Sequence, residues 1–309
     1  MNVLKRILAL AIALVICTCL YGCKRNTVEV ETGITYEDKQ PVLDIMTTNN
    51  ISKNLVRYIT KDRHDIESIF YDDVPHTDFK YTEDTISNIS SKDLFFYLGS
   101  AYEPWSDSLI PKIELKNLGC INISRGIKLQ SYNDTLTVQG TTYSDNPYFY
   151  YSLSNLRTIL FNIKISIEEK DPKNRSFYED NFNDSMKAID ALADDINKNS
   201  SKLKNITVVL STDQMEYYFK ELGLNILKVP YENISESDVN KINESLNKNK
   251  KDGKVIIWIY SEENEHKIYD EIIRNNNIGM LKLQIGEDNI IESMKESFSK
   301  ITGFSDKAS

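Results

Sequence analysis

The sequence predicts an α/β fold with two lobes, each built around a mainly parallel β-sheet, joined by a long rigid linker helix. Three observations lead to this prediction. Short apolar runs of strand length alternate with helical patterns over residues 41–126, as is typical of βαβ units and parallel sheets. One continuous helical stripe then extends over 171–197, and the strand–helix alternation begins again at residue 206.

The N-terminus predicts export. Two basic residues precede an apolar run over residues 7–20. A basic start followed by a short apolar stretch is typical of a secretory signal peptide. The run is shorter than the roughly 20 apolar residues that a membrane-spanning helix needs. We therefore predict a signal peptide over residues 1–22.

The sequence LYGC, which ends at Cys23, resembles the cleavage motif of bacterial lipoproteins, although Tyr21 stands where a small residue is usual. We predict that Cys23 is lipidated and that residues 23–40, which lack an apolar period, form a tether. The alternative is a plain buried cysteine in an uncleaved anchor. Beyond this point only Cys120 remains, so the sequence offers no disulfide framework.

Residues 41–170 are expected to form the first lobe. Ile51, Leu55 and Ile59 recur at a spacing of four, which places them on one helical face. The strands are expected at 41–48, 65–71, 94–99 and 121–126. The helices are expected at 51–59, at 82–93 with Thr82 as its cap, and at 154–169.

Residues 171–200 are expected to form the linker helix. Asp171 is the expected N-cap, and Pro172 occupies the first helical position, where its missing N–H does no harm. An apolar stripe continues along the segment at Phe182, Met186, Ile189, Ala193 and Ile196. A helix of about 25 residues would be roughly 38 Å long, which suits a connection between lobes better than a place inside one.

Residues 201–309 are expected to form the second lobe, where the alternation resumes. The strands are expected at 206–211, 225–230, 254–260 and 279–285. The helices are expected at 212–224, 235–249, 262–277 and 289–302.

Charge and motif content exclude several classes of function. The chain carries 46 acidic and 37 basic residues, a formal net charge of −9, and an acidic surface argues against nucleic-acid binding. The sequence contains no GxSxG, P-loop, HExxH or dinucleotide-binding glycine motif. We therefore do not expect an enzyme.

Five motifs carry a resemblance to a known family. They are PHTDFKYTEDT from Pro75, KDLFFYLGSAYEPW from Lys92, NPYFYYSLSNLRTILFNI from Asn146, DPKNRSFYEDN from Asp171 and STDQMEYYFKELGL from Ser211. Together they resemble the lipoprotein receptors of bacterial zinc and manganese ABC importers, whose two lobes are tied by one rigid helix. The resemblance covers nearly all of the chain after Cys23.

The resemblance also implies a metal site that has lost most of its ligands. In this family three histidines and one carboxylate usually hold the metal. His76 keeps the first position, whereas Tyr148 and Thr212 stand where the second and third histidines would be. LQIG resembles the family's carboxylate motif with one residue missing, which puts Gln284 at or near the fourth position. His64 and His266 fall outside the motif positions.

The substitutions leave weak neutral donors where Zn²⁺ prefers imidazole and carboxylate. Asp213, next to Thr212, and Asp145, near Tyr148, are possible substitute donors. His76 is equally open to a structural interpretation as an inherited loop residue. The aromatic run from Tyr148 has two possible interpretations. Its rings either pack between the lobes or line a pocket for an uncharged ligand.

The resemblance implies an extracytoplasmic solute-binding lipoprotein of a metal-type ABC importer, anchored in the cell membrane and delivering its solute to a membrane permease. No resident cofactor is expected; Zn²⁺ or Mn²⁺ would be the transported ligand. A monomer is expected. Two alternatives stay open: the same scaffold binding a non-metal solute, and an envelope adhesion or binding protein with an empty cleft.

Overall fold

A computed structural model describes residues 42–72, 78–99, 102–114, 119–138, 141–231, 233–262, 265–286 and 288–308. The expected signal peptide and tether, with Cys23, and the expected ligand His76 lie outside these ranges. Within them, no helix combines the length and apolar character needed to cross a membrane.

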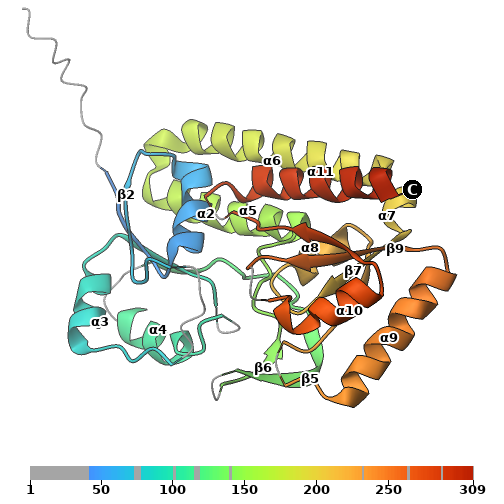
Figure 1. Cartoon of the computed structure of the whole chain (residues 1–309). Coiled ribbons are helices and arrows are strands. Elements are labelled where there is room, and N and C mark those ends of the chain that lie inside the picture. Colours follow the sequence, from blue (N-terminus) through green and yellow to red (C-terminus); the bar gives the residue numbers. More distant parts are fainter. Residues whose placement is uncertain are drawn as a thin grey trace, which may run out of the picture. The chain divides into compact units, whose positions relative to one another are not determined.

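The first lobe contains a four-stranded parallel sheet with the order β2-β1-β3-β4 (Figure 1). Its strands are β1 (Asp44–Thr47), β2 (Asp65–Ser68), β3 (Leu94–Tyr97) and β4 (Gly119–Asn122). Its helices include α2 (Asn50–Thr60), α3 (Glu83–Ser90) and α4 (Ser106–Glu114). Thr82 caps α3 in a capping box, as expected.

The second lobe repeats the arrangement with the order β10-β9-β7-β8, again with every neighbour parallel. Its strands are β7 (Ile206–Leu210), β8 (Asn225–Lys228), β9 (Val255–Tyr260) and β10 (Gly279–Lys282). Its helices are α7 (Ser200–Leu203), α8 (Glu216–Glu221), α9 (Glu236–Lys251), α10 (Asp270–Asn275), which follows the short 3₁₀ turn η2 (Lys267–Tyr269), and α11 (Ile290–Ala308).

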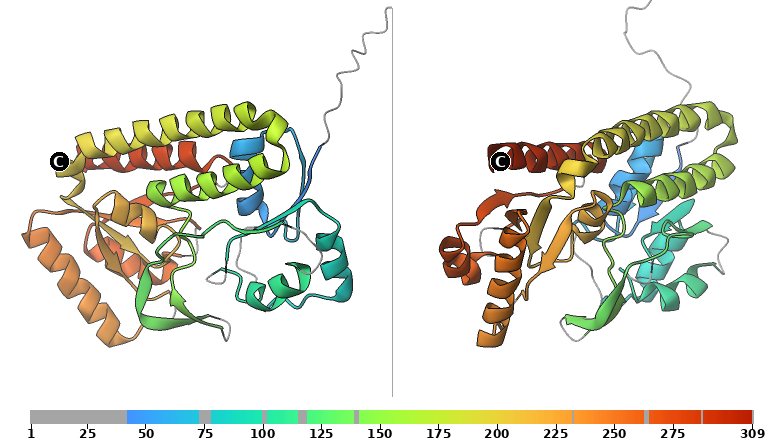
Figure 2. Two further views of the ribbon diagram at one scale, coloured as in Figure 1. Left: turned by 180° about the vertical axis from the view of Figure 1, so that it is seen from behind. Right: turned by 90° about the vertical axis from the view of Figure 1, so that its right-hand side faces the viewer.

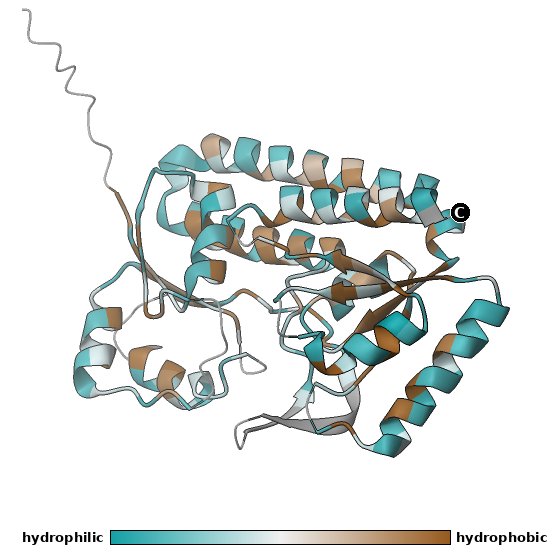
Figure 3. Ribbon diagram, in the orientation of Figure 1, coloured by the Kyte–Doolittle hydropathy of each residue, from teal (hydrophilic) through white to brown (hydrophobic). Residues whose placement is uncertain are grey.

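Burial on both faces explains why the two central strands, β7 and β9, read as continuous apolar runs. All five residues of β7 are buried. In Figure 3 the strands of this sheet are coloured as apolar, while α9 and α10 carry mostly polar colour. Gly279 of β10 meets the ring of Phe304 from α11, where any Cβ would lie within 3 Å of that ring. The glycine therefore lets α11 pack closely on the edge of the sheet.

A long helix, α6 (Arg175–Lys198), connects the lobes, after α5 (Leu153–Lys170) and the 3₁₀ turn η1 (Pro172–Asn174). It packs on α5 and α2 and farther along on α11, which runs beside it (Figures 1 and 2). Of the expected stripe, Ile189 and Ile196 are buried, and the other members pack partly buried against the core. The predicted fold class of two α/β lobes with a long connecting helix is confirmed.

The two lobes also meet directly, beside the long helix. Tyr58 of α2 donates to the side chain of Asn289 (2.8 Å) and accepts from Ile291 N (3.2 Å) at the start of α11. Asn54 donates to Asp288 (3.2 Å) in the same region. One apolar core cluster runs through both lobes, from Ile45 to Ile301 in sequence. These contacts and the shared core favour a rigid connection.

One helix and one β-hairpin between residues 102 and 145 were absent from the sequence prediction. Helix α4 carries Pro111 in its interior, where proline removes an N–H and normally argues against a helix. The strands β5 (Ser131–Val138) and β6 (Thr141–Asp145) form an antiparallel hairpin. Their polar, threonine-rich sequence gives no clear apolar alternation. The fourth strand of the first lobe also lies slightly earlier than predicted, at Gly119–Asn122.

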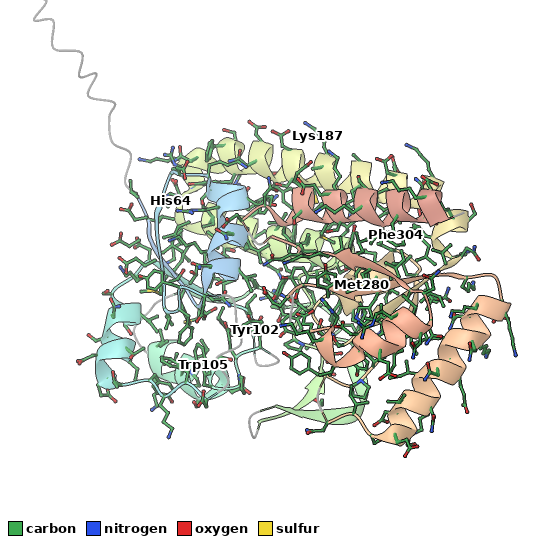
Figure 4. The ribbon with its side chains drawn as sticks, viewed as in Figure 1. His64, Tyr102, Trp105, Lys187, Met280 and Phe304 are labelled. Carbon is green, nitrogen blue, oxygen red and sulfur yellow. The ribbon has the colours of Figure 1, made fainter. Side chains whose placement is uncertain are left out.

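A buried polar network joins the first lobe to the start of the linker region (Figure 4 labels His64). His64 Nδ1 accepts from Leu43 N (3.1 Å), so the neutral ring carries its proton on Nε2, which lies 2.7 Å from Tyr178 Oη. Tyr178 in turn donates to the Asp171 carboxylate (2.5 Å). Asn174 also donates to Asp171. Asp171 occupies the N-cap position of η1 and is followed by Pro172, as expected, but its side chain makes no cap hydrogen bond and instead accepts from Tyr178 and Asn174.

The protonation states of His64 and Asp171 agree with these hydrogen bonds. Burial lowers the pKa of His64, although Asp171 acts in the opposite direction. Burial acts to raise the pKa of Asp171, but hydrogen bonds from Tyr178 and Asn174 outweigh it, with help from the nearby guanidinium of Arg63. Arg63 Nε lies 3.5 Å from Asp171 Oδ2. The network therefore holds a neutral histidine and an ionised aspartate side by side.

The chain contains two tryptophans, one in the core of each lobe. Trp105 packs its edge on Phe79 (5.0 Å between ring centroids) and Phe70 (6.3 Å) in the first lobe. Trp258 of β9 is fully buried against Tyr269 (4.8 Å) in the second.

Candidate functional site

The carboxyl ends of the strands in each parallel sheet meet at one edge, where α/β proteins usually place their ligands. In the first lobe, the loop after β3 carries Tyr102 and Glu103. In the second, the loop after β7 carries Thr212, Asp213 and Gln214, and the loop after β10 carries Gln284. The segment from Asn146 to Ser152 follows β6 and leads into α5.

A cluster of tyrosine rings joins these loops. The ring of Tyr148 meets Tyr102 edge to face (6.3 Å, 88°) and Tyr150 in the same manner (6.3 Å, 73°). Tyr150 also packs on Tyr102 (6.2 Å) and on Tyr151 (4.5 Å). Tyr151 accepts a hydrogen bond from Gln214 (3.1 Å). Figure 4 places Tyr102 at the junction of the two lobes, so the cluster forms a continuous path from one lobe to the other.

The structure holds Tyr148 and Thr212 in neighbouring loops. The buried side chain of Asn146 accepts from Tyr148 N (2.9 Å) and donates to the carbonyl oxygen of Asp213 (3.1 Å). Both Tyr148 and Thr212 are half-buried. Gln284 is exposed, and its loop is separated from that of Thr212 by β9 in the sheet order. His76 is outside the described residues, so three of the four expected positions have a described place.

Both possible substitute donors have partners in the structure. Asp213 is ion-paired with Lys228, which also contacts Glu216 (3.0 Å). Burial acts to lower the pKa of Lys228, but Asp213 and Glu216 together raise it. Asp145 accepts a hydrogen bond from the hydroxyl of Ser131 (2.7 Å). Lys228 competes with a cation for Asp213, whereas Asp145, which accepts from a hydroxyl, keeps lone pairs for a cation.

Across the described ranges, no group of three or more histidine, cysteine, aspartate or glutamate side chains is arranged to hold a metal ion. The side chains of these four types in the described ranges would therefore supply at most two of the ligands of a metal bound here. Hydroxyl and amide oxygens are weaker ligands for Zn²⁺ than imidazole and carboxylate.

Glu103 belongs to the motif from Lys92, where the sequence predicts a structural role for it, and it is almost fully buried in the loop after β3 (2% exposed). Its carboxylate accepts from Leu98 N (2.8 Å) and Gly99 N (3.1 Å). Burial raises the pKa of Glu103 to about 7, although hydrogen bonds from Thr48 and the loop backbone act to lower it. Gly99 has a φ of +111°, a conformation that favours glycine. Glu103 thus stabilises the sharp turn that presents Tyr102.

Asn146 and Gln214 went unrecognised as site residues. Asn146 belongs to an Asn-Pro pair, a turn signal, and it bonds a residue 67 positions away. Local sequence carries no sign of such a contact.

Comparisons with known proteins agree with this architecture. A family model described as "Zinc-uptake complex component A periplasmic" matches residues 45–302. The high-affinity zinc uptake system protein ZnuA of Bacillus subtilis is 24% identical over 272 residues, which cover 85% of this chain and 82% of that protein. The metal ABC transporter substrate-binding lipoprotein FimA of Streptococcus parasanguinis is 24% identical over 234 residues, 72% of this chain and 70% of that one.

Solved structures resemble the chain in fold. The metal-dependent lipoprotein YcdH of Bacillus subtilis superposes with a TM-score of 0.66 at 19% identity, covering 87% of this chain and 97% of that one. The AdcAII protein of Streptococcus pneumoniae superposes with a TM-score of 0.66 at 20% identity, covering 85% and 99%.

Proposed function

The chain belongs to the family of periplasmic zinc-uptake components A, and from this we propose that it is an extracytoplasmic solute-binding lipoprotein of a metal-type ABC importer. The observation that carries the proposal is the family match over residues 45–302, together with two parallel-sheet lobes joined by a long helix. The family is one of solute-binding transport proteins and not of enzymes. The protein would bind its solute between the lobes and deliver it to a membrane permease.

The transported solute in this proposal is Zn²⁺ or Mn²⁺, bound reversibly and not as a resident cofactor. His76 would supply the one remaining imidazole, and Tyr148, Thr212 and Gln284 would supply neutral oxygens. A phenol with a usual pKa near 10 stays protonated at neutral pH and is then a poor metal ligand. We therefore expect the binding of the metal to be weak unless Asp213 or Asp145 also becomes a ligand.

The organisation that goes with this function is a signal peptide over 1–22, a tether over 23–40, a first lobe over 41–170, a linker over 171–200 and a second lobe over 201–309. The protein would be a monomer anchored by a lipid on Cys23 to the outer face of the cell membrane. The lipoprotein names of related proteins support this placement.

Calorimetric titration of Zn²⁺ and Mn²⁺ into the metal-free protein tests the proposed solute. We expect saturable binding at micromolar affinity or weaker, reduced at least tenfold by His76→Ala because one imidazole ligand is lost. Asp184→Ala, which removes an exposed carboxylate of the linker helix α6, outside the loops that carry the proposed ligands, should leave the affinity unchanged. Binding that His76→Ala leaves unaltered would favour a non-metal solute or an adhesion function on the same scaffold.

Replacing Cys23 tests the anchor. Cys23→Ser removes the sulfur that would carry the lipid, so the variant is expected to leave the membrane fraction or to persist as an unprocessed precursor. The measurement is membrane fractionation with a mobility comparison on gels. Cys120→Ser, which changes a thiol in the folded part of the chain, is the matched control and should fractionate like the wild type. A Cys23→Ser protein that behaves in the same way as the wild type would rule out lipidation.

A further inference from the structure

Helix α5 begins just after the aromatic residues 148–151. Its first N–H groups donate to a side chain of the second lobe. The carboxylate of Glu221 accepts from Leu153 N (2.5 Å) and Ser154 N (3.0 Å), and the Ser154 hydroxyl also donates to it. Free N–H groups and the positive end of the helix dipole make a helix start a favourable place for a carboxylate. Because Glu221 is the last residue of α8, this contact ties α5 to the second lobe.

A second side chain of α8 holds the base of the β5–β6 hairpin. The hydroxyl of Tyr217 accepts from Gln130 N (2.7 Å) and donates to the carbonyl oxygen of Asn146 (3.1 Å). Burial raises the pKa of Tyr217 to about 12, so the hydroxyl is protonated and can make both bonds. Gln130 and Asn146 are themselves joined by a backbone hydrogen bond (2.9 Å). The base of the β5–β6 hairpin is therefore attached to α8 just before the aromatic residues 148–151.

Asn146 fixes the tyrosine at the centre of the site. Its side chain joins Tyr148 N to the carbonyl oxygen of Asp213, next to Thr212. With 1% of its surface exposed, this amide has no competition from bulk water. On its other side Tyr148 meets Tyr102 of the first lobe through an edge-to-face ring contact, an interaction worth roughly a tenfold factor or less in an equilibrium.

We propose that Glu221, Tyr217 and Asn146 form an interlobe latch that sets Tyr148 beside Thr212 in the absence of solute. Glu221 and Asn146 are then positioning residues of the site, because they act through the backbone of the segment and not on the solute. The latch rests on its own contacts; only its consequence for solute binding rests on the proposed function.

Hydrogen exchange resolved to single amides, on the full chain without solute, tests the latch. Glu221→Gln removes the charge and one acceptor oxygen, so exchange at Leu153 and Ser154 is expected to rise at least tenfold. If the three side chains act as one latch, exchange at Tyr148 and Gln130 rises in the same variant. A rise confined to Leu153 and Ser154 would reduce the latch to separate local bonds and overturn the proposal.

Variants at Asn146 separate positioning from general loosening. Asn146→Asp keeps the acceptor for Tyr148 N but loses the donor to Asp213, whereas Asn146→Ala loses both. Exchange at Tyr148 should therefore rise at least tenfold in both variants, because each loses the bond to the second lobe. A wild-type exchange rate at Tyr148 in Asn146→Asp would show that the bond to Asp213 does not hold this segment, and would overturn the latch.

The matched control is Asp238→Asn, because Asp238 accepts from Ser235 N at the start of α9 within one lobe. The Asp238→Asn variant should raise hydrogen exchange at the start of α9 and leave the exchange rate of the Tyr148 amide unchanged. Zn²⁺ added to the wild type should leave the exchange rates of the four amides, those of Gln130, Tyr148, Leu153 and Ser154, unchanged. A tenfold fall in these rates would mean that the solute, and not the latch, orders this part of the chain. The comparison of variants is made without solute, so its outcome does not depend on whether the protein binds a metal.

Discussion

Replacing Tyr148, Thr212 and Gln284 together by histidine, histidine and aspartate is expected to raise the affinity for Zn²⁺ by about a thousandfold or more. The changes restore two imidazoles and one carboxylate, the donors that tetrahedral zinc sites use. Altering only the partners that support a metal ligand changes affinity by about 10–100-fold. Three restored ligands, each contributing at least about tenfold, give the stated factor.

Calorimetry measures the change directly, and thermal unfolding provides a second measure. At free Zn²⁺ about 100 times the dissociation constant, binding stabilises the folded state by about 2.7 kcal/mol. Adding His76→Ala to the triple variant should remove most of the gain. Two histidines at exposed positions elsewhere, Val42→His with Phe161→His, control for non-specific binding. A triple variant that binds no better than this control would mean that these three positions do not converge on one site.

Asp171→Ala is expected to destabilise the fold by about 3 kcal/mol. Asp171 accepts hydrogen bonds from Tyr178 and Asn174 and lies beside the guanidinium of Arg63. Removing one member of a buried charged pair costs about 3–5 kcal/mol, and the partial exposure of Arg63 (24% of its side chain) places this case at the lower end. Chemical denaturation of the wild type and the variant measures the difference.

The control lies near the C-terminal end of α6, the helix that follows Asp171 and η1. Asp195 forms an exposed ion pair with Lys198, and exposed pairs contribute at most about 1 kcal/mol. Asp195→Ala should therefore change the free energy of unfolding much less than Asp171→Ala. Equal effects would show that the buried network contributes nothing beyond an ordinary surface charge.

The pH dependence identifies the contribution of His64 to this network. The usual pKa of histidine is near 6.5, and burial lowers the pKa of His64 in the folded protein. The unfolded chain then binds more protons, so the stability due to the neutral ring is complete above about pH 6.5 and is lost as the pH falls below that value. This loss should be absent in His64→Gln. Over the same range the folded state takes up a proton at Glu103, whose pKa burial raises to about 7, and this increases stability in both proteins. Equal stability changes of the wild type and His64→Gln from pH 7 to pH 5 would contradict the neutral assignment.

Hydrophobic periodicity was sufficient to predict the lobes and the long helix, because their strands and stripes bury apolar faces that recur at regular spacing. It failed where other forces decide the structure. Helix α4 tolerates Pro111, and the β5–β6 hairpin has polar strands. Helix α8 begins only at Glu216, later than predicted, and the side chains of Asp213 and Gln214 before it bond Lys228 and Tyr151.

The site was predictable only as a set of positions. The motifs placed Tyr148 and Thr212 by resemblance, and the structure holds them in neighbouring loops through Asn146. The pairing of Asp213 with Lys228 and the contact of Glu221 with the start of α5 join residues far apart in sequence. No local sequence pattern predicts contacts between residues so far apart. The ion pair of Asp213 with Lys228 and the latch could therefore not be derived before the fold was known.

The separate placement of the two tryptophans gives the protein a native optical reporter in each lobe. Trp105→Phe leaves indole emission from the second lobe alone, and Trp258→Phe leaves emission from the first. Each single-tryptophan protein can then follow one lobe during denaturation or metal addition without an attached dye. Superimposable unfolding curves from the two would identify the lobes as one cooperative unit, as their continuous core and direct contacts lead us to expect.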